Sequence, residues 1–554
     1  MVLLGESHKH QISYHKYREA YWEFMEAIDP EHSRPLDVHR WSDHPEIKVL
    51  TDGIWIEITE IDGLVAIPTG NRKPLAPLIK QLRVLLVDLY VAWLADSTLS
   101  IGISRNNNSY TPKSRYNGLH ISKDLIKVVD ALVAIGLLDH HNFHHDRVYG
   151  GKNSKTSRYR PSNKLQDRFS KLQDLVFDIS FNEERETIVL SDFEIDEEGT
   201  FIKTKDGKKK RSLIEYEDDD HPLIVPWRLS LCRYNELLAR SHIDISSLDK
   251  PYVEREIKDG KVQRVPVGRS NQWVKRVFSR NSWEMNGRFY GGWWQQVSSS
   301  YRKDIRIDGS PTVEIDYKGM HVAMLAAECG VVMNEDYDWY TLDEVVVTGL
   351  DKATQRKALK LLVLTAINAA SKETAYKAYQ SKRTASKDDI TSLHEFPRLN
   401  KGQLDLLLTC FIEKHPFLAD GICSDRGIGL MFMDSQITDI IINSFVEQNE
   451  PILTVHDSYI VKTDKADFLQ QTMAEATQLV VNSKLPAEHE GQFTRQQSQQ
   501  ILNQFRQHDF RTYLDLLGNK LNRSPHKPVQ TNRYQNDYNK FKKWRENKEA
   551  NEQQ

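Results

Sequence analysis

The chain has 554 residues, with 75 basic and 78 acidic side chains and a formal net charge of −3 at pH 7. This length predicts two to four domains, and 39% hydrophobic with 28% charged residues is ordinary for a globular protein. No apolar run has membrane-spanning length and the first residues lack a signal-peptide core, which argues against a membrane protein and predicts a cytosolic one. Its four cysteines form no Cys-x-x-Cys pair, so neither a zinc ribbon nor a disulfide framework is predicted.

Residues 1–75 mix aromatic and charged side chains and indicate an α/β segment, a helix followed by short strands. The alternating stretch IWIEI at 54–58 is the strand candidate. Nothing in this tract points to a particular chemistry.

Residues 76–170 predict a winged helix-turn-helix. An apolar helix is expected over 78–94, and a second is expected from Ser122, as N-cap, to Gly136, where glycine stops it. A strand over 140–145, a polar basic loop at 150–157 and a strand over 158–161 follow. In a winged helix one helix enters the major groove and the hairpin contacts phosphates, for which the candidates are Lys152, Lys155 and Arg158. The alternative is a helix and hairpin that pack on the next domain, with these cations merely solvated.

Two tracts read as poorly structured. Residues 171–224 carry charge blocks of opposite sign and predict a charged linker or insertion. Residues 491–554 are polar and predict a C-terminal helix or tail, of which a frayed tail is favoured.

The histidines at 140, 141, 144 and 145 predict no metal site, because adjacent strand residues point to opposite faces.

Two acids follow apolar strand patterns far apart in the chain. Asp316 ends the stretch TVEID and precedes a helical pattern, and Asp457 lies between two apolar stretches of a hairpin, PILTV and SYIVK. Two carboxylates on adjacent strand ends can converge on divalent cations, an arrangement suited to phosphoryl or nucleotidyl transfer. Between them, residues 351–372 predict a helix with Arg356 and Lys360 on one face, able to grip a triphosphate or, alternatively, only solvated.

In this order the segments resemble motifs A, B and C of the family A polymerases, the bacterial polymerase I type, and of the related single-subunit RNA polymerases. Asp316-Tyr317 is similar to motif A, the Arg356 and Lys360 helix to motif B, and His456-Asp457 to motif C. Asn286-Gly-Arg-Phe resembles the segment that precedes motif A and touches primer and template, and residues 434–441 resemble the helix before motif C. The resemblance covers about residues 285 to 465.

The resemblance implies an α+β right-hand polymerase with an N-terminal, mainly helical region that contains the winged helix. The palm and fingers would span 311–490, and a thumb-like, primer- and template-contacting region 225–310. A DNA-directed DNA polymerase is implied, acting on a DNA primer-template with nucleoside triphosphates and two Mg²⁺ ions, for which Mn²⁺ can substitute. It implies catalysis by Asp316, Asp457, Lys360 and Arg356, and metal binding by Asp316, Asp457 and Tyr317. It further implies nucleotide contacts at Arg356, Lys360, Asn368 and His321, and nucleic-acid contacts at Arg288, Arg302, Lys303, Gln436 and His456.

Departures from the family pattern keep two alternatives open. Asn368 and His321 stand where the DNA enzymes carry a tyrosine and a glutamate, and His456-Asp457-Ser458 is the RNA-polymerase form of motif C. One alternative is therefore a single-subunit RNA polymerase or a primase-like enzyme. The other is a non-catalytic DNA-binding replication protein with a degenerate palm.

Overall fold

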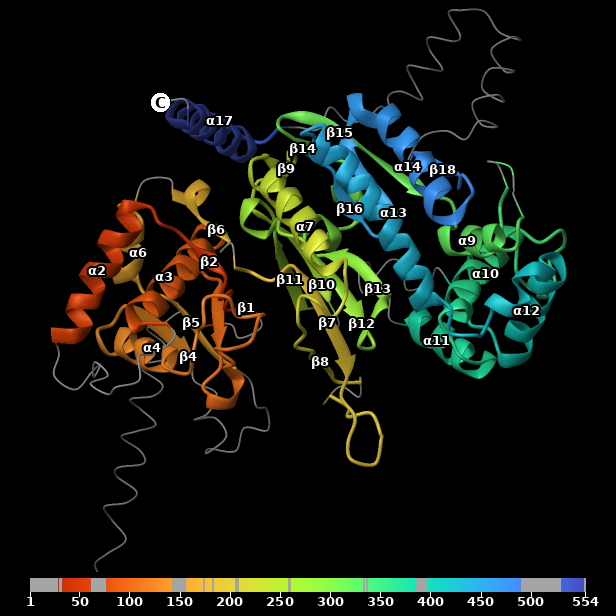
Figure 1. Ribbon diagram of the computed structural model, residues 1–554, viewed down its shortest axis with the longest axis horizontal. Helices are drawn as coiled ribbons and strands as arrows, with labels where there is room; N and C mark the ends of the chain where they lie inside the picture. The colour runs from red at the N-terminus through yellow and green to blue at the C-terminus, as the bar shows by residue number, and fades with distance from the viewer. Residues whose placement is uncertain are drawn as a thin grey trace, which may run out of the picture. The chain divides into compact units, whose positions relative to one another are not determined.

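A computed structural model describes residues 28, 32–60, 76–141, 156–172, 175–181, 184–204, 209–257, 261–331, 334, 337–384, 396–489 and 530–552. The chain divides into two compact units, residues 1–185 and 186–554. Helices and strands occur in both units (Figure 1). Among the described helices, none combines the length and apolar character that crossing a bilayer requires.

The first unit is built on a four-stranded sheet of order β1-β3-β5-β4. Its strands are β1 (Ser33–Pro35), β3 (Ser100–Ile103), β4 (Leu138–His141) and β5 (Ser157–Pro161). Its main helices are α2 (Pro45–Glu60), α3 (Leu78–Ala95), α4 (Leu125–Ala134) and α6 (Asn163–Phe169). A separate two-stranded sheet joins β2 (Arg40–Trp41) to β6 (Ser180–Phe181). The core lies between α3 and its neighbours, because α3 is buried along most of its length.

The strand expected at 54–58 is wrong, because these residues belong to helix α2. Its buried side chains are Ile47, Thr51, Ile54 and Ile58, the spacing of one helix face. Alternation of isoleucines at 54, 56 and 58 matches a strand only within that short window, and Ile56 is in fact exposed. Ile47 extends the set of buried positions at helical spacing and so distinguishes a helix from a strand.

The two helices expected in the 76–170 tract are present as α3 and α4. Gly136 ends α4 with φ +71°, and Leu137 donates its amide to the Leu132 carbonyl oxygen at 2.9 Å. The N-cap is Asp124 rather than Ser122, since a turn over residues 122–125 precedes the helix. Strands β4 and β5 pair antiparallel, and β5 also pairs antiparallel with β3.

A buried carboxylate organises the edge of this unit. Asp88 of α3 is fully buried and accepts from Arg34 Nη2 at 2.7 Å, and Arg40 Nε lies 2.8 Å from the same carboxylate. The Asp37 amide also donates to Asp88 at 3.0 Å. One acid thus satisfies two guanidinium groups from the segment around β1 and β2, which holds that segment on α3.

The second unit contains a sheet of order β16-β17-β15-β14-β9, with β18 beside β15, and a four-stranded sheet of order β13-β12-β7-β8. The strands of the first are β9 (Ile243–Ile245), β14 (Ile305–Ile307), β15 (Ser310–Tyr317), β16 (Leu453–Val455), β17 (Ser458–Lys462) and β18 (Ala487–His489). Those of the second are β7 (Ile188–Phe193), β8 (Arg211–Leu213), β12 (Lys275–Ser279) and β13 (Ser282–Tyr290). Strands β10 (Tyr252–Ile257) and β11 (Lys261–Pro266) form a separate hairpin.

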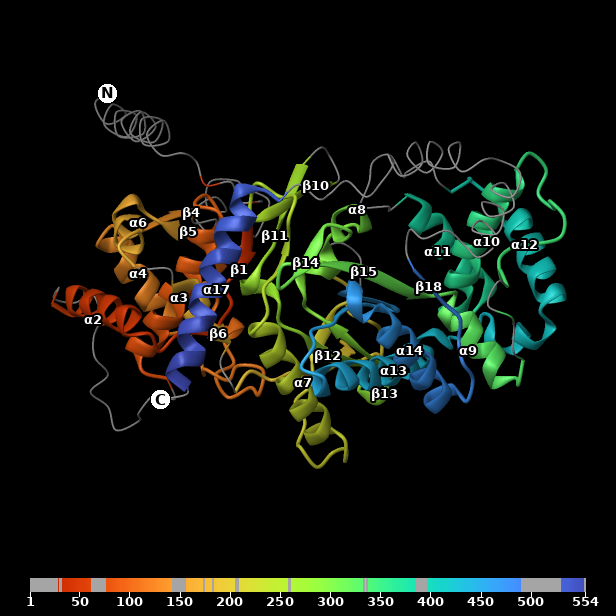
Figure 2. The same ribbon diagram turned by 90° about the horizontal axis from the view of Figure 1, so that it is seen from above.

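The longer helices of the second unit are α7 (Ile224–Ala239), α9 (Met320–Glu328), α10 (Lys352–Ile367), α11 (Lys372–Thr384), α12 (Lys401–Lys414), α13 (Gly427–Glu447), α14 (Ala466–Val481) and α17 (Asn532–Glu552). Helices α10, α11 and α12 pack on one another, and both views place them together at one end of this unit (Figure 2). Strand β15 leads into α9, which lies beside that helical group.

Helix α13 packs on β13, and Gly287 permits this close approach. A Cβ at Gly287 would lie 2.7 Å from Ser435 Oγ of α13, and its φ of +73° also favours glycine. Buried Arg276 of β12 ties the same elements together, donating to the Gly287 carbonyl oxygen at 2.8 Å and to Ser435 Oγ at 3.0 Å. The adjacent Trp293 and Trp294 are core residues, and Trp294 Nε1 donates to the Thr454 carbonyl oxygen at 3.0 Å.

Two polar tracts are more ordered than the sequence indicated. The tract 171–224 supplies β7 and β8, because the apolar run Ile188–Leu190 is buried against β12. Residues 532–552 form helix α17 rather than a frayed tail. Its buried Tyr534 and Phe541 pack around His242 next to β9, with ring centroids 5.5 Å and 5.4 Å away.

Replacing Asp88 tests the role of its carboxylate. Asp88→Ala removes the ion-pair partner of Arg34 and the nearer of the two acids at Arg40, which keeps Asp37 at 3.7 Å, so we expect the first unit to lose about 3–5 kcal/mol of stability. Hydrogen exchange of the α3 amides in the full chain measures the loss. The control is Asp130→Ala, which breaks only the exposed pair with Arg105 and should cost less than about 1 kcal/mol. Equal protection of α3 in the two variants contradicts the prediction.

Candidate active site

Asp316 and Asp457 lie next to each other at the end of two antiparallel strands. The register pairs Asp316 of β15 with Ser458 of β17, so Asp457 occupies the turn immediately before that partner. The Tyr317 amide donates to the Asp457 carbonyl oxygen at 3.3 Å. His456 completes the tight turn with a φ of +57°. The hairpin expected at 451–462 and the strand expected at 312–316 are thus confirmed, and their pairing brings the two acids together.

Asp316 is electrostatically unsatisfied. Burial and, after it, the negative charge of Asp457 together raise the pKa of its carboxyl group to about 8, with Lys360 as the opposing charge. Its Oδ1 is buried and has no hydrogen-bond partner. A carboxylate with an unpartnered buried oxygen beside a second acid is a site that lacks positive charge.

Helix α10 carries the expected basic residues but uses them differently. Lys360 is exposed, acts on Asp316 and lies 5.9 Å from the Tyr340 ring centroid. Arg356, one turn earlier, donates from Nη2 to Asp338 at 3.1 Å. Asn368 follows the last residue of the helix and donates to the Leu364 carbonyl oxygen at 2.8 Å. The structure therefore brings Lys360 to the acid pair and leaves Arg356 in an exposed ion pair.

Arg288 links β13 to α13 through an ion pair that the sequence did not reveal. Its guanidinium forms an ion pair with fully buried Asp434 of α13, and Nη2 donates to His321 Nε2 at 3.1 Å. Burial and Arg288 together lower the pKa of His321 to about 3, so the imidazole is neutral and accepts the bond. Burial raises the pKa of Asp434, and with Arg288 opposing this rise the pKa is about 6.

The remaining expected residues of this region are spread around the acids. Tyr317 has its phenol in the core, donating to the Met473 carbonyl oxygen at 2.8 Å, because successive strand residues face opposite sides. His456 lies 6.2 Å from Tyr290 between ring centroids. Arg302 forms a two-bond ion pair with Glu314, whose carboxylate also accepts from Ser458 Oγ at 2.7 Å. Lys303 is exposed next to Arg302, and Gln436 is half-buried on α13.

The residues predicted to contact DNA through a winged helix belong to the first unit. Lys152 and Lys155 lie outside the described residues. Arg158 is on β5, where its Nε donates to Ser33 Oγ at 2.7 Å, and it also bonds the Thr156 carbonyl oxygen. This bonding orients Arg158 along the sheet.

Sequence reasoning missed two acids at this site, Asp434 and Glu488. Glu488 of β18 is the direct cross-strand partner of Asp316, and it adds to the pKa rise of that residue. No signal marked it, because β18 is only three residues long and follows α14 after a short connection. Asp434 stood inside a segment already singled out, and its position on the apolar stripe of a helix was the available signal.

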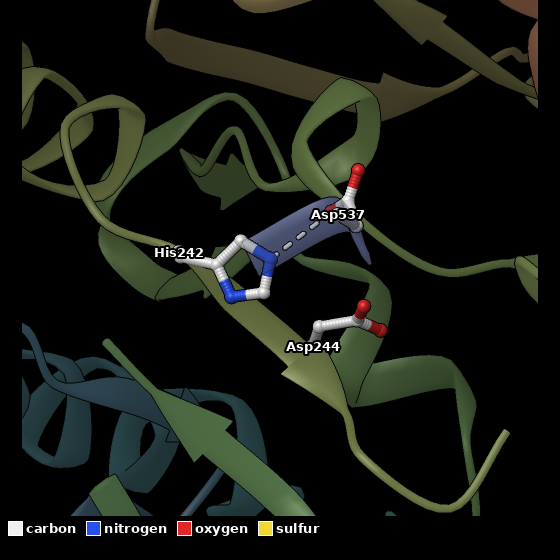
Figure 3. Close-up of side chains that lie close together, drawn as sticks. All are labelled: His242, Asp244 and Asp537. Carbon is white, nitrogen blue, oxygen red and sulfur yellow. Dashed lines mark hydrogen bonds and ion pairs between the residues drawn. The ribbon is translucent and has the colours of Figure 1, made fainter. Parts of the chain in front are cut away.

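A second group of possible metal ligands lies at the opposite end of the sheet. His242, Asp244 and Asp537 offer ligand atoms within 4.8 Å of one another (Figure 3). His242 Nε2 is 3.0 Å from Asp537 Oδ2, and Arg533 Nη2 donates to Asp244 Oδ1 at 2.9 Å. Because α17 itself supplies the cation at Asp244, we interpret the group as the attachment of α17 to β9.

No protein-family model matches this sequence, and no curated protein matches it. Among solved structures, the chain is similar to the polymerase domain of Pol1 from M. smegmatis in complex with DNA primer-template and dNTP, with a TM-score of 0.27 and 11% identity. The similarity covers 53% of this chain and 58% of that chain. A TM-score of 0.27 marks this as a weak structural similarity.

The Asp316–Asp457 pair predicts a pH-dependent stability. The folded-state pKa of Asp316, about 8, lies above its ordinary value of 3.8, so the unfolding free energy falls as pH rises between these values. Asp457→Asn removes one source of that shift. Without divalent ions at pH 8, we expect the variant to be more stable than the wild type by about 1 kcal/mol, the equivalent of roughly one pKa unit.

Chemical denaturation at pH 8 and at pH 4 measures this effect. The difference should vanish at pH 4, where folded Asp316 is protonated in the wild type and in the variant alike. The matched control is Asp464→Asn, which neutralises an exposed acid just after the same hairpin and should change neither value. A destabilised Asp457→Asn at pH 8 would contradict the assignment of these acids as a repelling pair.

Proposed function

We propose that this chain is a template-directed nucleic-acid polymerase, a DNA-directed DNA polymerase that adds nucleotides to a primer 3'-hydroxyl. The observation that carries the proposal is the pairing of β15 with β17, which sets Asp316 beside Asp457 with Lys360 acting on the pair. Paired carboxylates with a nearby cation suit nucleotidyl transfer. The segments that resemble motifs A, B and C also follow one another along the chain in that order, which supports the proposal.

The donor set fits divalent cations. Asp316 Oδ1 is a buried oxygen without a hydrogen-bond partner, and carboxylate oxygens are the ligands that Mg²⁺ prefers. We therefore propose that Asp316 and Asp457 hold two Mg²⁺ ions, for which Mn²⁺ can substitute, with the main chain at Tyr317 beside them. When bound, these ions supply charge neutralisation and a lowered pKa for the attacking hydroxyl.

The protein's own residues then hold and orient the substrates. Lys360 extends from α10 toward the acids and neutralises triphosphate charge, while Arg356 exchanges its exposed partner Asp338 for a phosphate. His321 and Asn368 contact the nucleotide. Arg288, fixed by Asp434, faces the primer-template together with His456, Gln436, Arg302 and Lys303. Much of the acceleration comes from positioning and preorganised charge.

The first unit binds double-stranded DNA as a winged helix in this proposal. The order α3, β3, α4, β4, β5 and the sheet order β3-β5-β4 support it, because β4 and β5 pair antiparallel as the strands of a wing do. Lys152, Lys155 and Arg158 would contact phosphates.

RNA synthesis is the second candidate. His321 occupies the position after β15 where a glutamate would be expected of a DNA enzyme, and Ser458 follows the second acid. Ser458 Oγ donates to Glu314 at 2.7 Å, so this serine has a defined structural partner in the turn. Primer extension with deoxynucleotides against ribonucleotides separates the two candidates.

Extension of a labelled primer on a DNA template tests the catalytic proposal. Asp316→Asn or Asp457→Asn should abolish incorporation, because the remaining acid cannot hold the ions alone. Lys360→Ala should lower the rate by about 10²–10³-fold, the typical effect of one charge-stabilising contact. The control is Lys352→Ala at the start of the same helix, which should leave the rate unchanged. Equal incorporation by wild type and both acid variants refutes the assignment.

Salt-dependent binding of duplex DNA tests the winged helix. Lys152→Gln with Lys155→Gln should weaken duplex binding and reduce the slope of log K against log salt by about 1.8, near 0.9 for each lost phosphate contact. Lys171→Gln, which removes an exposed lysine beyond α6, is the control. Fluorescence anisotropy measures both. An unchanged slope in the double variant contradicts the proposal.

A further inference from the structure

The connection between β7 and β8 is a branched β-hairpin that no part of the proposed reaction uses. Phe193 pairs with Arg211 at its base, and farther out Ile195 bridges to Phe201 and Lys203 bridges to Lys209. The hairpin exposes four large apolar side chains, namely Ile195, Phe201, Ile202 and Leu213. Residues 205–208 lie outside the described part of the chain.

Strand alternation sorts the charges of this hairpin onto two different faces. Directly paired residues share a face, so Phe193, Arg211, Phe201, Lys203 and Lys209 lie together. The ring contacts agree: Phe193 and Phe201 meet edge to face at 5.7 Å, and Lys209 Nζ lies 3.4 Å from the Phe201 centroid. Arg211 lies 4.8 Å from the Phe193 centroid. We call this set the aromatic-basic face.

The opposite face is net negative, with two acids and one lysine among its described strand residues. It carries Asp192 and Glu194, and Lys210 pairs with Glu194 at 2.7 Å. Among the described strand residues of the hairpin, the acids are therefore on one face and the aromatic-basic face has three cations. The acids Asp196, Glu197 and Glu198 lie in the turn beyond the strands.

Two cations of the aromatic-basic face act on residues that lead toward the candidate active site. Burial raises the pKa of Tyr290, and Arg288 and, more weakly, Arg211 oppose this rise. The ring of Tyr290 lies 6.2 Å from that of His456 in the turn before Asp457. Lys209 also acts, after Arg280, on Asp425, which lies just ahead of α13.

We propose that the aromatic-basic face binds single-stranded nucleic acid, with bases against Phe193 and Phe201 and phosphates at Lys203, Lys209 and Arg211. Exposed Phe201 and half-buried Phe193 lie beside cations, the combination that single strands require, since every base has a π-face and every nucleotide a phosphate. Because the acidic strand residues lie on the opposite face, the aromatic-basic face is positively charged and complements the phosphates of a nucleic acid. This inference rests on the proposed polymerase function, in which the aromatic-basic face guides the unpaired template strand to the active site.

Binding of a fluorescent oligothymidine to the full chain tests the proposal without requiring catalysis. Lys209→Gln and Arg211→Gln should each weaken binding about three- to tenfold at low salt and lower the salt slope by about 0.7. Phe201→Ala should weaken binding by about fivefold or more while the salt slope stays unchanged, because stacking releases no counterions. The matched control is Lys210→Gln, which removes a lysine between the two tested cations but on the opposite face.

The outcomes separate this inference from the polymerase proposal. Affinity that falls in the three variants and not in the control supports the hairpin, even if the wild type extends no primer. If the wild type extends a primer but its hairpin variants bind the oligonucleotide as well as the Lys210→Gln control does, the hairpin inference is wrong and the polymerase proposal stands. Failure of the wild type to bind the oligonucleotide, or an equal loss in Lys210→Gln, also overturns it. Selective loss of binding to an acidic peptide, with DNA affinity unchanged, would show a protein partner instead.

Discussion

The antiparallel register between β15 and β17 is the constraint on which the rest of the site depends. It sets Asp316 opposite Ser458 and therefore beside Asp457, although 141 positions separate the two acids (457 − 316). Strand side chains alternate between faces, so a slip of one residue would turn Asp316 into the core and bring Tyr317 out. The buried phenol of Tyr317, bonded to Met473, opposes such a slip. Core packing on one face thus fixes the chemistry on the other.

A second layer of structure holds the groups around the acids. Gly287 lets α13 approach β13 closely, and this approach lets Arg288 reach Asp434 on the helix. Removing a partner from a buried ion pair leaves an uncompensated charge, so the pair fixes the position of Arg288 strongly. Burial, with the same arginine, keeps His321 neutral, and its Nε2 accepts the hydrogen bond of Arg288. One close helix–strand contact therefore contributes to the protonation state and orientation of a side chain on a third element, α9.

The sequence predicted elements whose signals are local and missed those that depend on distant partners. The strand at 312–316, the helix of Lys360 and the hairpin around Asp457 each have their own pattern of apolar residues, and these were found. Glu488 is different, because its three-residue strand has meaning only beside β15. Helix α17 was read as a tail since its polar composition conceals an aromatic stripe that packs only when His242 lies beneath it. The strand prediction at 54–58 failed because the positions of apolar residues over only five residues fit both the two-residue period of a strand and the 3.6-residue period of a helix.

The balance of charge explains why two acids in this fold favour a bound cation. Arg288 is near Asp457 but is committed to Asp434, so its charge is already shared. Lys360 is the cation that acts on Asp316, and it is exposed, which weakens its effect through solvent screening. The pKa of Asp316 remains near 8 despite that lysine, with Asp457, Glu314 and Glu488 all adding negative charge. Two apolar side chains would pack at these positions without this electrostatic cost. The presence of two acids is understandable if the free energy that they cost is recovered when positive charge binds together with the substrate.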